Sequence, residues 1–228
     1  MEPRELPDLV KQENVAFIYL LDKETNINSP VNIDIIKDNS KISYKNFLNK
    51  LLAHYCQMAT SEIKIEKAKY GKPYLTGKKK IWFNVSHSNN AIVILLSSTS
   101  EVGIDVEYFN PKRDYQKIAK RFFHSKEIDK INSLSNFDAN KTSHQLWCLK
   151  ESYIKAIGKG LYHPLNKFYF KLNTGNTTTL LDDSPEFSND NFWTCEFRSI
   201  NENYGFAFCI KKGSAITQYS LNDNKIIS

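Results

Sequence analysis

The sequence predicts an α+β protein made of two halves, each with strands and at least one long helix. Its 228 residues are 41% hydrophobic and 13% aromatic, which suits one large domain or two domains of about 100–120 residues. Alternating and helical apolar patterns both occur on each side of the segment Glu107–Asp114, which contains Pro111. We therefore expect an N-terminal half over residues 1–106 and a C-terminal half over residues 107–228.

The first half is predicted to contain several strands and one helix. Val15–Leu21 is an apolar run typical of a buried strand, and Tyr44–Gln57 carries its apolar residues at helical spacing. Ile81–Val85 and Ala91–Leu96 are predicted strands, and the polar segment Ser86–Asn90 between them is the predicted turn.

The second half begins with helical patterning over Tyr115–Phe123, and a stronger helix is predicted over Ser143–Ile157. Thr142 and Gln145 form a capping-box pattern at the start of this helix, and Gly158 lies where it would end. An antiparallel sheet is predicted from three later segments, Phe168–Leu172, Phe192–Arg198 and Tyr204–Lys211. Residues 173–191 are predicted to form a loop, and the tail after Gly213 shows only a weak pattern.

The cysteines Cys56, Cys148, Cys195 and Cys209 form no C-x-x-C pair, and each has apolar or aromatic neighbours. This favours buried free thiols over a zinc site or a disulfide framework. The longest apolar runs are far shorter than the ~20 residues that span a bilayer. The charged N-terminus leads into no signal-type apolar core, so we expect a cytoplasmic protein that does not enter a membrane.

A formal charge of +6 predicts attraction to nucleic acid, a membrane, a polyphosphate ligand or an acidic protein. Charge alone does not choose among them. No groove-reading motif accompanies the lysine clusters, so nucleic-acid binding ranks last among the functions considered.

Two acids on a predicted strand form the first candidate site. In Val102–Glu107 the apolar side chains alternate with Gly103, Asp105 and Glu107, so the two acids leave the same face. Their Cα atoms would lie roughly 6.6 Å apart, at about 3.3 Å per residue. Such a pair suits Mg²⁺, which binds one or two carboxylates together with substrate phosphates. The alternative is an exposed strand with two solvated acids.

A second candidate lies on the predicted long helix, where Trp147, Glu151 and Lys155 are spaced by four residues and share one stripe. Glu151 and Lys155 could also form only a surface ion pair, worth about 0.2–0.5 kcal/mol. The donor-rich turn with Ser86 and His87 could hold a phosphate, or could satisfy only its own backbone. Lys72 precedes Pro73, which favours an extended conformation; its alternative is a plain loop lysine.

Together, and in this order, the segments resemble the Sfp-type phosphopantetheinyl transferases over about Tyr70 to Leu165. The matching segments are Gly71-Lys72-Pro73, Phe83-Asn84-Val85-Ser86-His87-Ser88, Gly103-Ile104-Asp105-Val106-Glu107, Arg121-Phe122-Phe123 with Glu127, and Trp147-x-x-Lys150-Glu151-Ser152 with Lys155 and Gly158-Lys159-Gly160-Leu161.

The resemblance implies the phosphopantetheinyl transferase fold: two similar α+β halves with antiparallel sheets and pseudo-twofold symmetry, with coenzyme A in the cleft between them. It also implies roles for nine residues. Asp105, Glu107 and Glu151 would bind Mg²⁺; Lys72, Ser86 and Lys155 would hold the pyrophosphate and His87 the ribose phosphate; Lys150 would be a second cation; and Glu127 would act as a base, a member of the metal shell or a structural anchor.

The implied reaction transfers the phosphopantetheine arm of coenzyme A to a serine of an apo acyl or peptidyl carrier protein and releases adenosine bisphosphate. Glu151, or a water or hydroxide that it orients, would accept the serine proton, and Lys155 would neutralise or protonate the leaving phosphate. The alternative is a non-catalytic relative that binds coenzyme A or a carrier. It is motivated by the segment ahead of the first long helix, which has few of the basic residues that contact the nucleotide in related enzymes; Lys37, Lys41 or Lys45 would take their place.

The resemblance further implies a monomer that acts on an acidic carrier, which the +6 charge fits. Carrier specificity is expected on the surface between Asn110 and Lys130. Carriers of fatty acid, polyketide and nonribosomal peptide biosynthesis all remain open.

Overall fold

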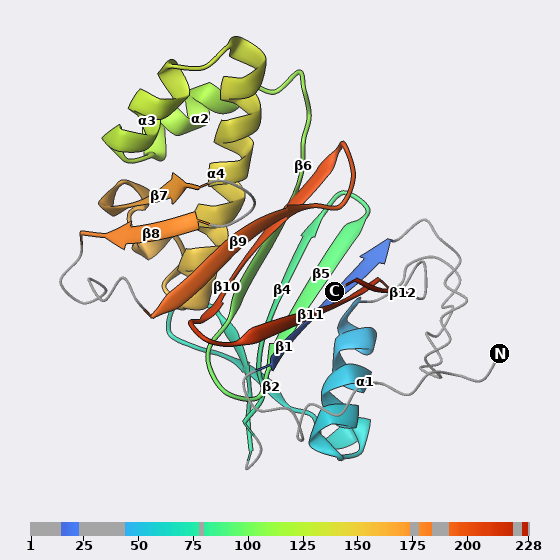
Figure 1. Cartoon of the computed structure of the whole chain (residues 1–228). Coiled ribbons are helices and arrows are strands. Elements are labelled where there is room, and N and C mark those ends of the chain that lie inside the picture. The colour runs from blue at the N-terminus through green and yellow to red at the C-terminus, as the bar shows by residue number, and fades with distance from the viewer. Residues whose placement is uncertain are drawn as a thin grey trace.

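Two stacked sheets with a helix on each outer face make up the fold in the computed structural model (Figure 1). The structure describes residues 15–22, 44–77, 80–173, 178–183, 192–220 and 225–227. The first half contributes β1 (Val15–Asp22), α1 (Tyr44–Cys56), β2 (Ile65–Lys67), β3 (Pro73–Leu75), β4 (Trp82–Ser88) and β5 (Ala91–Ser97). Strand β6 (Gly103–Tyr108) crosses the expected boundary at residue 106. It is followed by α2 (Tyr115–Phe122), α3 (Ser125–Asn132), α4 (Asn136–Ala156), β7 (Phe168–Leu172), β8 (Thr178–Asp182), β9 (Trp193–Ser199), β10 (Tyr204–Lys211), β11 (Ala215–Ser220) and β12 (Lys225–Ile227).

The two main sheets draw strands from distant parts of the chain. The larger sheet has the order β12-β11-β1-β5-β4, and the smaller has the order β6-β10-β9. Their pairings are antiparallel except that β11 runs parallel to β1, from Val15 opposite Ala215 to Leu20 opposite Ser220. Short antiparallel pairs, β2 with β3 and β7 with β8, complete the sheets. The larger sheet thus contains strands from both ends of the described chain.

Alternation along the strands divides the interior into three cores. Even-numbered β5 residues such as Ile92 pack with the apolar stripe of α1, whereas Val93 and Leu95 face the second sheet. On that sheet Phe206 and Phe208 face β5, and Ala207 joins the core formed with α4. The layers are therefore helix, sheet, sheet and helix, and the α+β class predicted from the sequence is confirmed.

Helix α4 lies unusually close to β6 because the contact position on the strand is a glycine. A Cβ atom at Gly103 would lie 2.0 Å from the backbone oxygen of Ser152 and 2.3 Å from the backbone nitrogen of Ala156. Such distances are far inside van der Waals contact, so only glycine permits this approach. The close packing fixes the C-terminal half of α4 against the strand that carries Asp105 and Glu107.

Several element boundaries differ from the sequence prediction. Strand β4 extends through Ser86 and His87 to Ser88, so the turn shrinks to two residues and Asn89 adopts a positive φ of 48°. Helix α4 begins at Asn136, because the Ser135 side chain accepts a hydrogen bond from the Asp138 N–H and caps it there. Helix α3, the strand β8 inside the expected loop and the tail strands β11 and β12 were not predicted.

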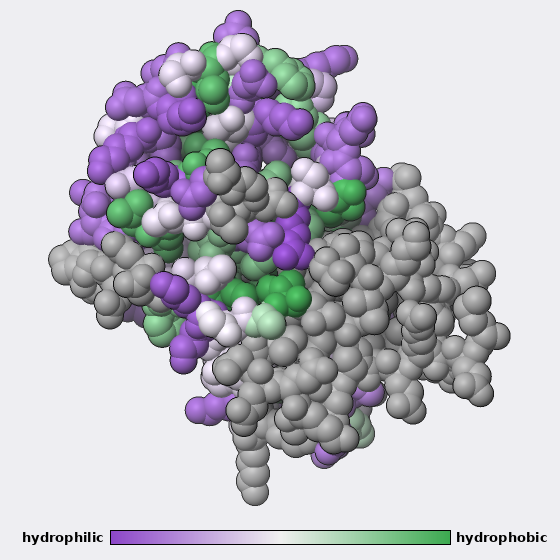
Figure 2. Space-filling model, in the orientation of Figure 1, coloured by the Kyte–Doolittle hydropathy of each residue, from purple (hydrophilic) through white to green (hydrophobic). Residues whose placement is uncertain are grey.

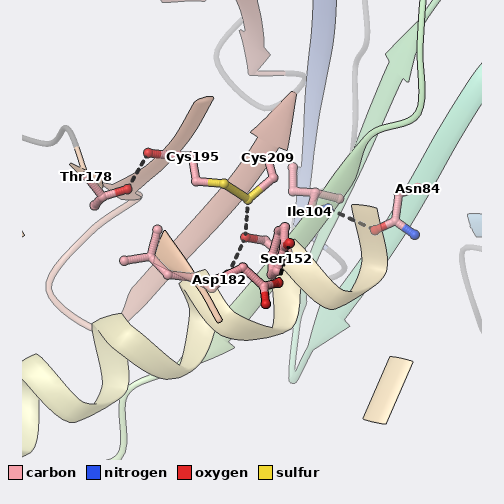
Figure 3. Close-up of a disulfide and its surroundings, with 9 residues drawn as sticks. Asn84, Ile104, Ser152, Thr178, Asp182, Cys195 and Cys209 are labelled. Atoms are coloured by element: carbon pink, nitrogen blue, oxygen red, sulfur yellow. Dashed lines mark hydrogen bonds between the residues drawn. A yellow bond between two sulfur atoms is a disulfide. The ribbon is translucent and has the colours of Figure 1, made fainter. Parts of the chain in front are cut away.

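Two of the four cysteines form a disulfide, which corrects the expectation of free thiols only. Cys195 of β9 and Cys209 of β10 are paired directly across the two strands and are joined covalently (Figure 3), whereas Cys56 and Cys148 are buried and are not part of a disulfide. The bond faces α4, where the Ser152 hydroxyl lies 3.3 Å from the Cys209 sulfur. The pairing depends on strand register, which the spacing of cysteines in the sequence does not reveal.

Among the described helices, none combines the length and the apolar composition that a membrane crossing requires.

Candidate active site

The candidate site lies where the edge strand of each main sheet meets the other, between β4 and β6. Three side chains of β4, two residues apart, link the strands. The Asn84 side chain accepts from the Ile104 N–H at 2.8 Å, the Ser86 hydroxyl donates to Asp105 at 2.9 Å, and the Ser88 hydroxyl donates to Glu107 at 3.1 Å. Figure 3 shows the first of these bonds. The two acids are therefore held by a matching row of polar residues from the other sheet.

Asp105 is a buried carboxylate with one engaged and one unengaged oxygen. Its Oδ1 accepts from the Ser86 hydroxyl and from the Lys155 ammonium, the latter at 2.6 Å. Its Oδ2 is buried and has no hydrogen-bond partner among the described residues. A buried carboxylate oxygen without a donor is costly, which suits a site that receives a cation.

Glu107 lies two residues further along the same face and is held from two sides. The Trp147 indole Nε1 donates to its Oε1 at 3.2 Å, and Ser88 donates to its Oε2. Burial raises the pKa of Glu107, and the charge of Asp105 raises it further, although these two hydrogen bonds oppose the shift. The ionised form of Glu107 is therefore destabilised unless positive charge is nearby.

Helix α4 brings Glu151 and Lys155 to the same place. Burial raises the pKa of Glu151 to about 7, and the negative charges of Asp105 and Glu107 add to this rise against the effect of Lys155. Burial also lowers the pKa of Lys155, but the charge and hydrogen bond of Asp105 outweigh it, so the net pKa is raised. Glu151 is half-buried and lies within the field of both strand acids.

The donor set fits a hard divalent cation, because three carboxylates supply only oxygen ligands and Asp105 Oδ2 is unengaged. As the side chains stand, no three Asp, Glu, His or Cys groups within the described ranges lie close enough together to hold a metal ion. Lys155 instead compensates Asp105, while Trp147 and Ser88 hold Glu107.

Lys72, which was expected to contact the pyrophosphate, is bound to other groups of the protein in this structure. Its ammonium pairs with Glu101 and donates to the backbone oxygens of Val102 at 3.0 Å and Ala156 at 2.9 Å. Burial lowers the pKa of Lys72, while Glu101 opposes this shift. The residue thereby ties the loop before β3 to the start of β6 and the end of α4.

Glu127 and Lys150, both expected to serve the reaction, are paired with each other in the interior. Their charged groups lie 2.7 Å apart, with side chains 1% and 0% exposed. Lys150 also donates to the backbone oxygens of Leu165 and Phe168, and Glu127 accepts from the Phe170 N–H at 2.9 Å. The helical turn explains this, because Lys150 is rotated about 100° from Glu151. Of the roles considered for Glu127, the structure favours the structural anchor.

The remaining residues expected to contact the nucleotide lie at the surface or outside the described residues. His87 is exposed on β4, in contrast to its neighbours Ser86 and Ser88. Lys45 is exposed at the start of α1, and Lys37 and Lys41 lie outside the described residues.

Two residues of this region escaped the sequence analysis. Ser88 contacts Glu107, and the two-residue spacing of Asn84, Ser86 and Ser88, which matches that of the acids, was a signal that could have found it. His144 is 3% exposed and donates a ring N–H to the Glu107 backbone carbonyl, although burial lowers its pKa to about 4. No sequence pattern marked His144.

Comparison with known proteins places this site in a family. The family model described as the 4'-phosphopantetheinyl transferase superfamily matches residues 101–209. A Synechocystis protein named as a candidate 4'-phosphopantetheinyl transferase is 34% identical over 181 residues, which cover 69% of this chain and 73% of that protein. The 4'-phosphopantetheinyl transferases gsp of Aneurinibacillus migulanus and Sfp of Bacillus subtilis are 35% and 32% identical, over 65% and 60% of this chain and 62% and 60% of their own lengths.

The chain belongs to the 4'-phosphopantetheinyl transferase family. Within it, the resemblance to the Sfp type that the motifs predicted is confirmed by the relatives. Among solved structures, holo-[acyl-carrier-protein] synthase of Thermotoga maritima matches 49% of this chain and 62% of its own, at 21% identity and a TM-score of 0.39, a likeness too weak to support an argument.

Proposed function

We propose that this protein transfers the phosphopantetheine arm of coenzyme A to a serine of an apo carrier protein, with Asp105, Glu107 and Glu151 at the reacting phosphate. Family membership supports the reaction. The observation that carries the site assignment is the 2.6 Å ion pair between Lys155 of α4 and Asp105 of β6, because Glu151 lies one helical turn before Lys155 on the same stripe of α4. The non-catalytic alternative draws no support from the relatives, which are named as transferases.

Asp105, Glu107 and Glu151 would hold Mg²⁺, and the unpartnered Oδ2 of Asp105 is the atom most in need of it. A bound Mg²⁺ would supply charge stabilisation for the pyrophosphate of coenzyme A.

Lys155 and Ser86 are the groups that we assign to the phosphate. The Lys155 ammonium lies 3.0 Å from the Ser86 hydroxyl and 2.6 Å from Asp105, so one cation and one donor stand together beside the acids. The raised pKa of Lys155 keeps this side chain charged at neutral pH. Lys155 would therefore offset charge on the leaving adenosine bisphosphate, in the way that lysines and arginines do at other phosphoryl-transfer sites.

Glu151 is the group that we assign to the proton of the carrier serine. A general base works best when its pKa lies near the working pH. Before a cation binds, burial and the two strand acids raise the pKa of Glu151 to about 7, whereas a Mg²⁺ held by the same carboxylate would lower it. Glu151 would therefore take the proton directly or through a water or hydroxide that it orients. Glu107 is less suited, because both of its oxygens already accept hydrogen bonds, from Trp147 and Ser88. Asp105 is less suited, because it is ion-paired with Lys155 through Oδ1 and its free Oδ2 is the atom that we assign to Mg²⁺.

The carrier would dock beside α2, within the surface between Asn110 and Lys130. A hollow of about 520 Å³ there is lined by the basic residues Lys112, Arg113, Lys117 and Lys120 and by one acid, Asp114. Hydrophilic residues dominate this end of the molecule, where α2 and α3 lie (Figure 2). An acidic carrier would associate faster with such a surface. Binding should weaken as the salt concentration rises about tenfold, from roughly 50 to 500 mM, because this shortens the Debye length about threefold.

The decisive experiment incubates the protein with coenzyme A, Mg²⁺ and a panel of apo carriers, followed by mass spectrometry of each carrier. We expect the mass gain of one phosphopantetheine group on at least one carrier. Asp105→Ala and Glu151→Gln should abolish the gain. Glu66→Gln, which changes an exposed acid of β2 that bonds only Tyr74 among the contacts described, is the matched control and should retain it.

Full activity in Asp105→Ala or Glu151→Gln would overturn the site assignment. Binding of coenzyme A in calorimetry, without transfer to any carrier, would instead favour the non-catalytic alternative. The expected monomer and cytoplasmic location are further proposals, to be tested by analytical ultracentrifugation and by cell fractionation.

A further inference from the structure

Ser88, the last residue of β4, connects one main sheet to an acid carried by the other. Strands β4 and β6 belong to different sheets, and side chains of β4 make the link between them. The Asn84 side chain accepts from the Ile104 N–H at 2.8 Å. Four residues further along both strands, the Ser88 hydroxyl accepts from the Tyr108 N–H at 3.1 Å. The edge of β6 is therefore held at two points on either side of its acids.

The Ser88 hydroxyl also contacts a carboxylate, and its hydrogen has a defined direction. The oxygen accepts from the Tyr108 N–H and donates to Glu107 Oε2, each at 3.1 Å. A serine hydroxyl has a single hydrogen, and the backbone N–H already occupies an acceptor position of its oxygen. The hydrogen is therefore directed toward the carboxylate of the residue that precedes Tyr108.

Glu107 is held at both of its oxygens by donors from different elements. Trp147 of α4 donates to Oε1 at 3.2 Å, and Ser88 of β4 donates to Oε2. The terminal torsion of a glutamate is broad when nothing restrains it, and one donor on each oxygen selects a single orientation. Each oxygen keeps a further lone pair that can bind a cation. The two donors thus orient the carboxylate and leave it able to act as a ligand.

The end of β4 is fixed by contacts of its own. In the turn after Ser88, the Asn90 N–H donates to the Tyr204 hydroxyl at 3.4 Å. Tyr204 lies directly opposite Tyr108 in the pairing of β10 with β6, and the two rings are in edge contact with centroids 5.2 Å apart. The hydroxyl donor is therefore in place before a ligand arrives, so that little conformational entropy is lost on binding.

We propose that Ser88 is a positioning residue, which orients Glu107 so that the site binds its divalent cation more tightly. This inference rests on the proposed function in one respect, the assignment of Glu107 to the cation. Partners that orient the ligands of a metal contribute about ten- to a hundredfold to metal affinity. Trp147 would still hold the other oxygen after loss of the Ser88 bond, so the lower end of this range, about tenfold, is expected.

Electron paramagnetic resonance of free Mn²⁺ measures the metal affinity of the full chain, with and without coenzyme A, because Mn²⁺ prefers the same oxygen ligands as Mg²⁺. We expect the Mn²⁺ dissociation constant to be about tenfold higher for Ser88→Ala than for the parent. Ser88→Thr, which keeps the hydroxyl, should bind Mn²⁺ as the parent does. Ser98→Ala, which changes a half-buried serine just after β5, is the matched control and should do the same.

The transfer assay supplies a second readout. The rate lost in Ser88→Ala should return in part as the Mg²⁺ concentration is raised, because the defect lies in metal affinity. A rate that stays equally low at every Mg²⁺ concentration would contradict a positioning role.

Equal Mn²⁺ affinity in Ser88→Ala and the parent would overturn the proposal, as would equal losses in Ser88→Ala and Ser88→Thr. Should Ser88→Ala fail to fold, Ser88→Cys keeps the shape but donates only weakly, and Mn²⁺ binding as tight as that of Ser88→Thr would then be the refuting result. A parent that loses Mn²⁺ affinity on Ser88→Ala but modifies no carrier would refute the proposed transfer and leave the role of Ser88 intact.

Discussion

The buried pair of Glu127 and Lys150 offers the sharpest test of a residue role that the sequence left open. Glu127→Gln keeps the size and one acceptor of the side chain but removes its charge. The Lys150 ammonium would then remain fully buried with two backbone oxygens and no anion. Breaking a buried ion pair in this way costs about 3–5 kcal/mol of the free energy of unfolding.

Burial already lowers the pKa of Lys150 to about 8, although Glu127 opposes this shift. Without Glu127 the pKa should fall further, so Lys150 would pass from charged to neutral nearer to neutral pH. The neutral amine relieves part of the cost, which places the expected loss at the lower end, about 3 kcal/mol.

Urea unfolding followed by tryptophan fluorescence measures this loss. With a denaturant slope of about 2 kcal/mol per molar, the midpoint should fall by roughly 1.5 M. Asp129→Asn, which changes an exposed acid on the same helix, should leave the midpoint within roughly 0.3 M of the parent. A Glu127→Gln protein with an unchanged midpoint but no transfer activity would refute the anchor role and return Glu127 to the reaction.

Two further outcomes follow from the packing around α4. Reduction of the Cys195–Cys209 bond, which closes a separation of 14 residues, should lower the free energy of unfolding by about 3 kcal/mol, and the double change of both cysteines to valine should make stability insensitive to reductant. Gly103→Ala should destabilise the fold by about 3 kcal/mol and impair transfer, because its Cβ would displace α4 from β6. Gly71→Ala, in open space at a φ of +88°, should cost only about 1–2 kcal/mol and serves as the control; equal losses in the two variants would contradict the close-packing argument.

Local sequence patterns predicted those parts of the fold that depend on neighbours along the chain. The alternation in Val102–Glu107 correctly placed Ile104 and Val106 in the core and both acids on the opposite face. The start of α4 was misplaced, because the pattern at Thr142 competes with a real cap at Ser135, and only the structure shows which hydroxyl is used. Strand register, and with it the disulfide, depends on pairing between distant segments and left no local trace.

In the candidate site, too, local sequence patterns identified some residues, and only the tertiary structure identified others. Asp105 and Glu107 share one face of β6, and Glu151 and Lys155 share one stripe of α4, as the sequence predicts; in the structure Lys155 pairs with Asp105 across these two elements. Lys150 is adjacent to Glu151 in the sequence, but the turn of the helix directs its side chain into the interior, where it forms an ion pair with Glu127. Ser88 could have been identified from its two-residue spacing with Asn84 and Ser86, whereas His144 contacts Glu107 through tertiary packing that no spacing rule within one element reveals.

The parallel pairing of β1 with β11 has a consequence for biosynthesis. Val15 pairs with Ala215, so this part of the sheet can form only after about 200 further residues have been synthesised. During translation one edge of β1 is therefore left without its final neighbour, a situation that slows folding and exposes a strand to unintended pairing with other nascent chains. Ribosome-bound chains that end before residue 215 should consequently depend on chaperones more than chains that extend past it, which limited proteolysis of stalled intermediates can measure.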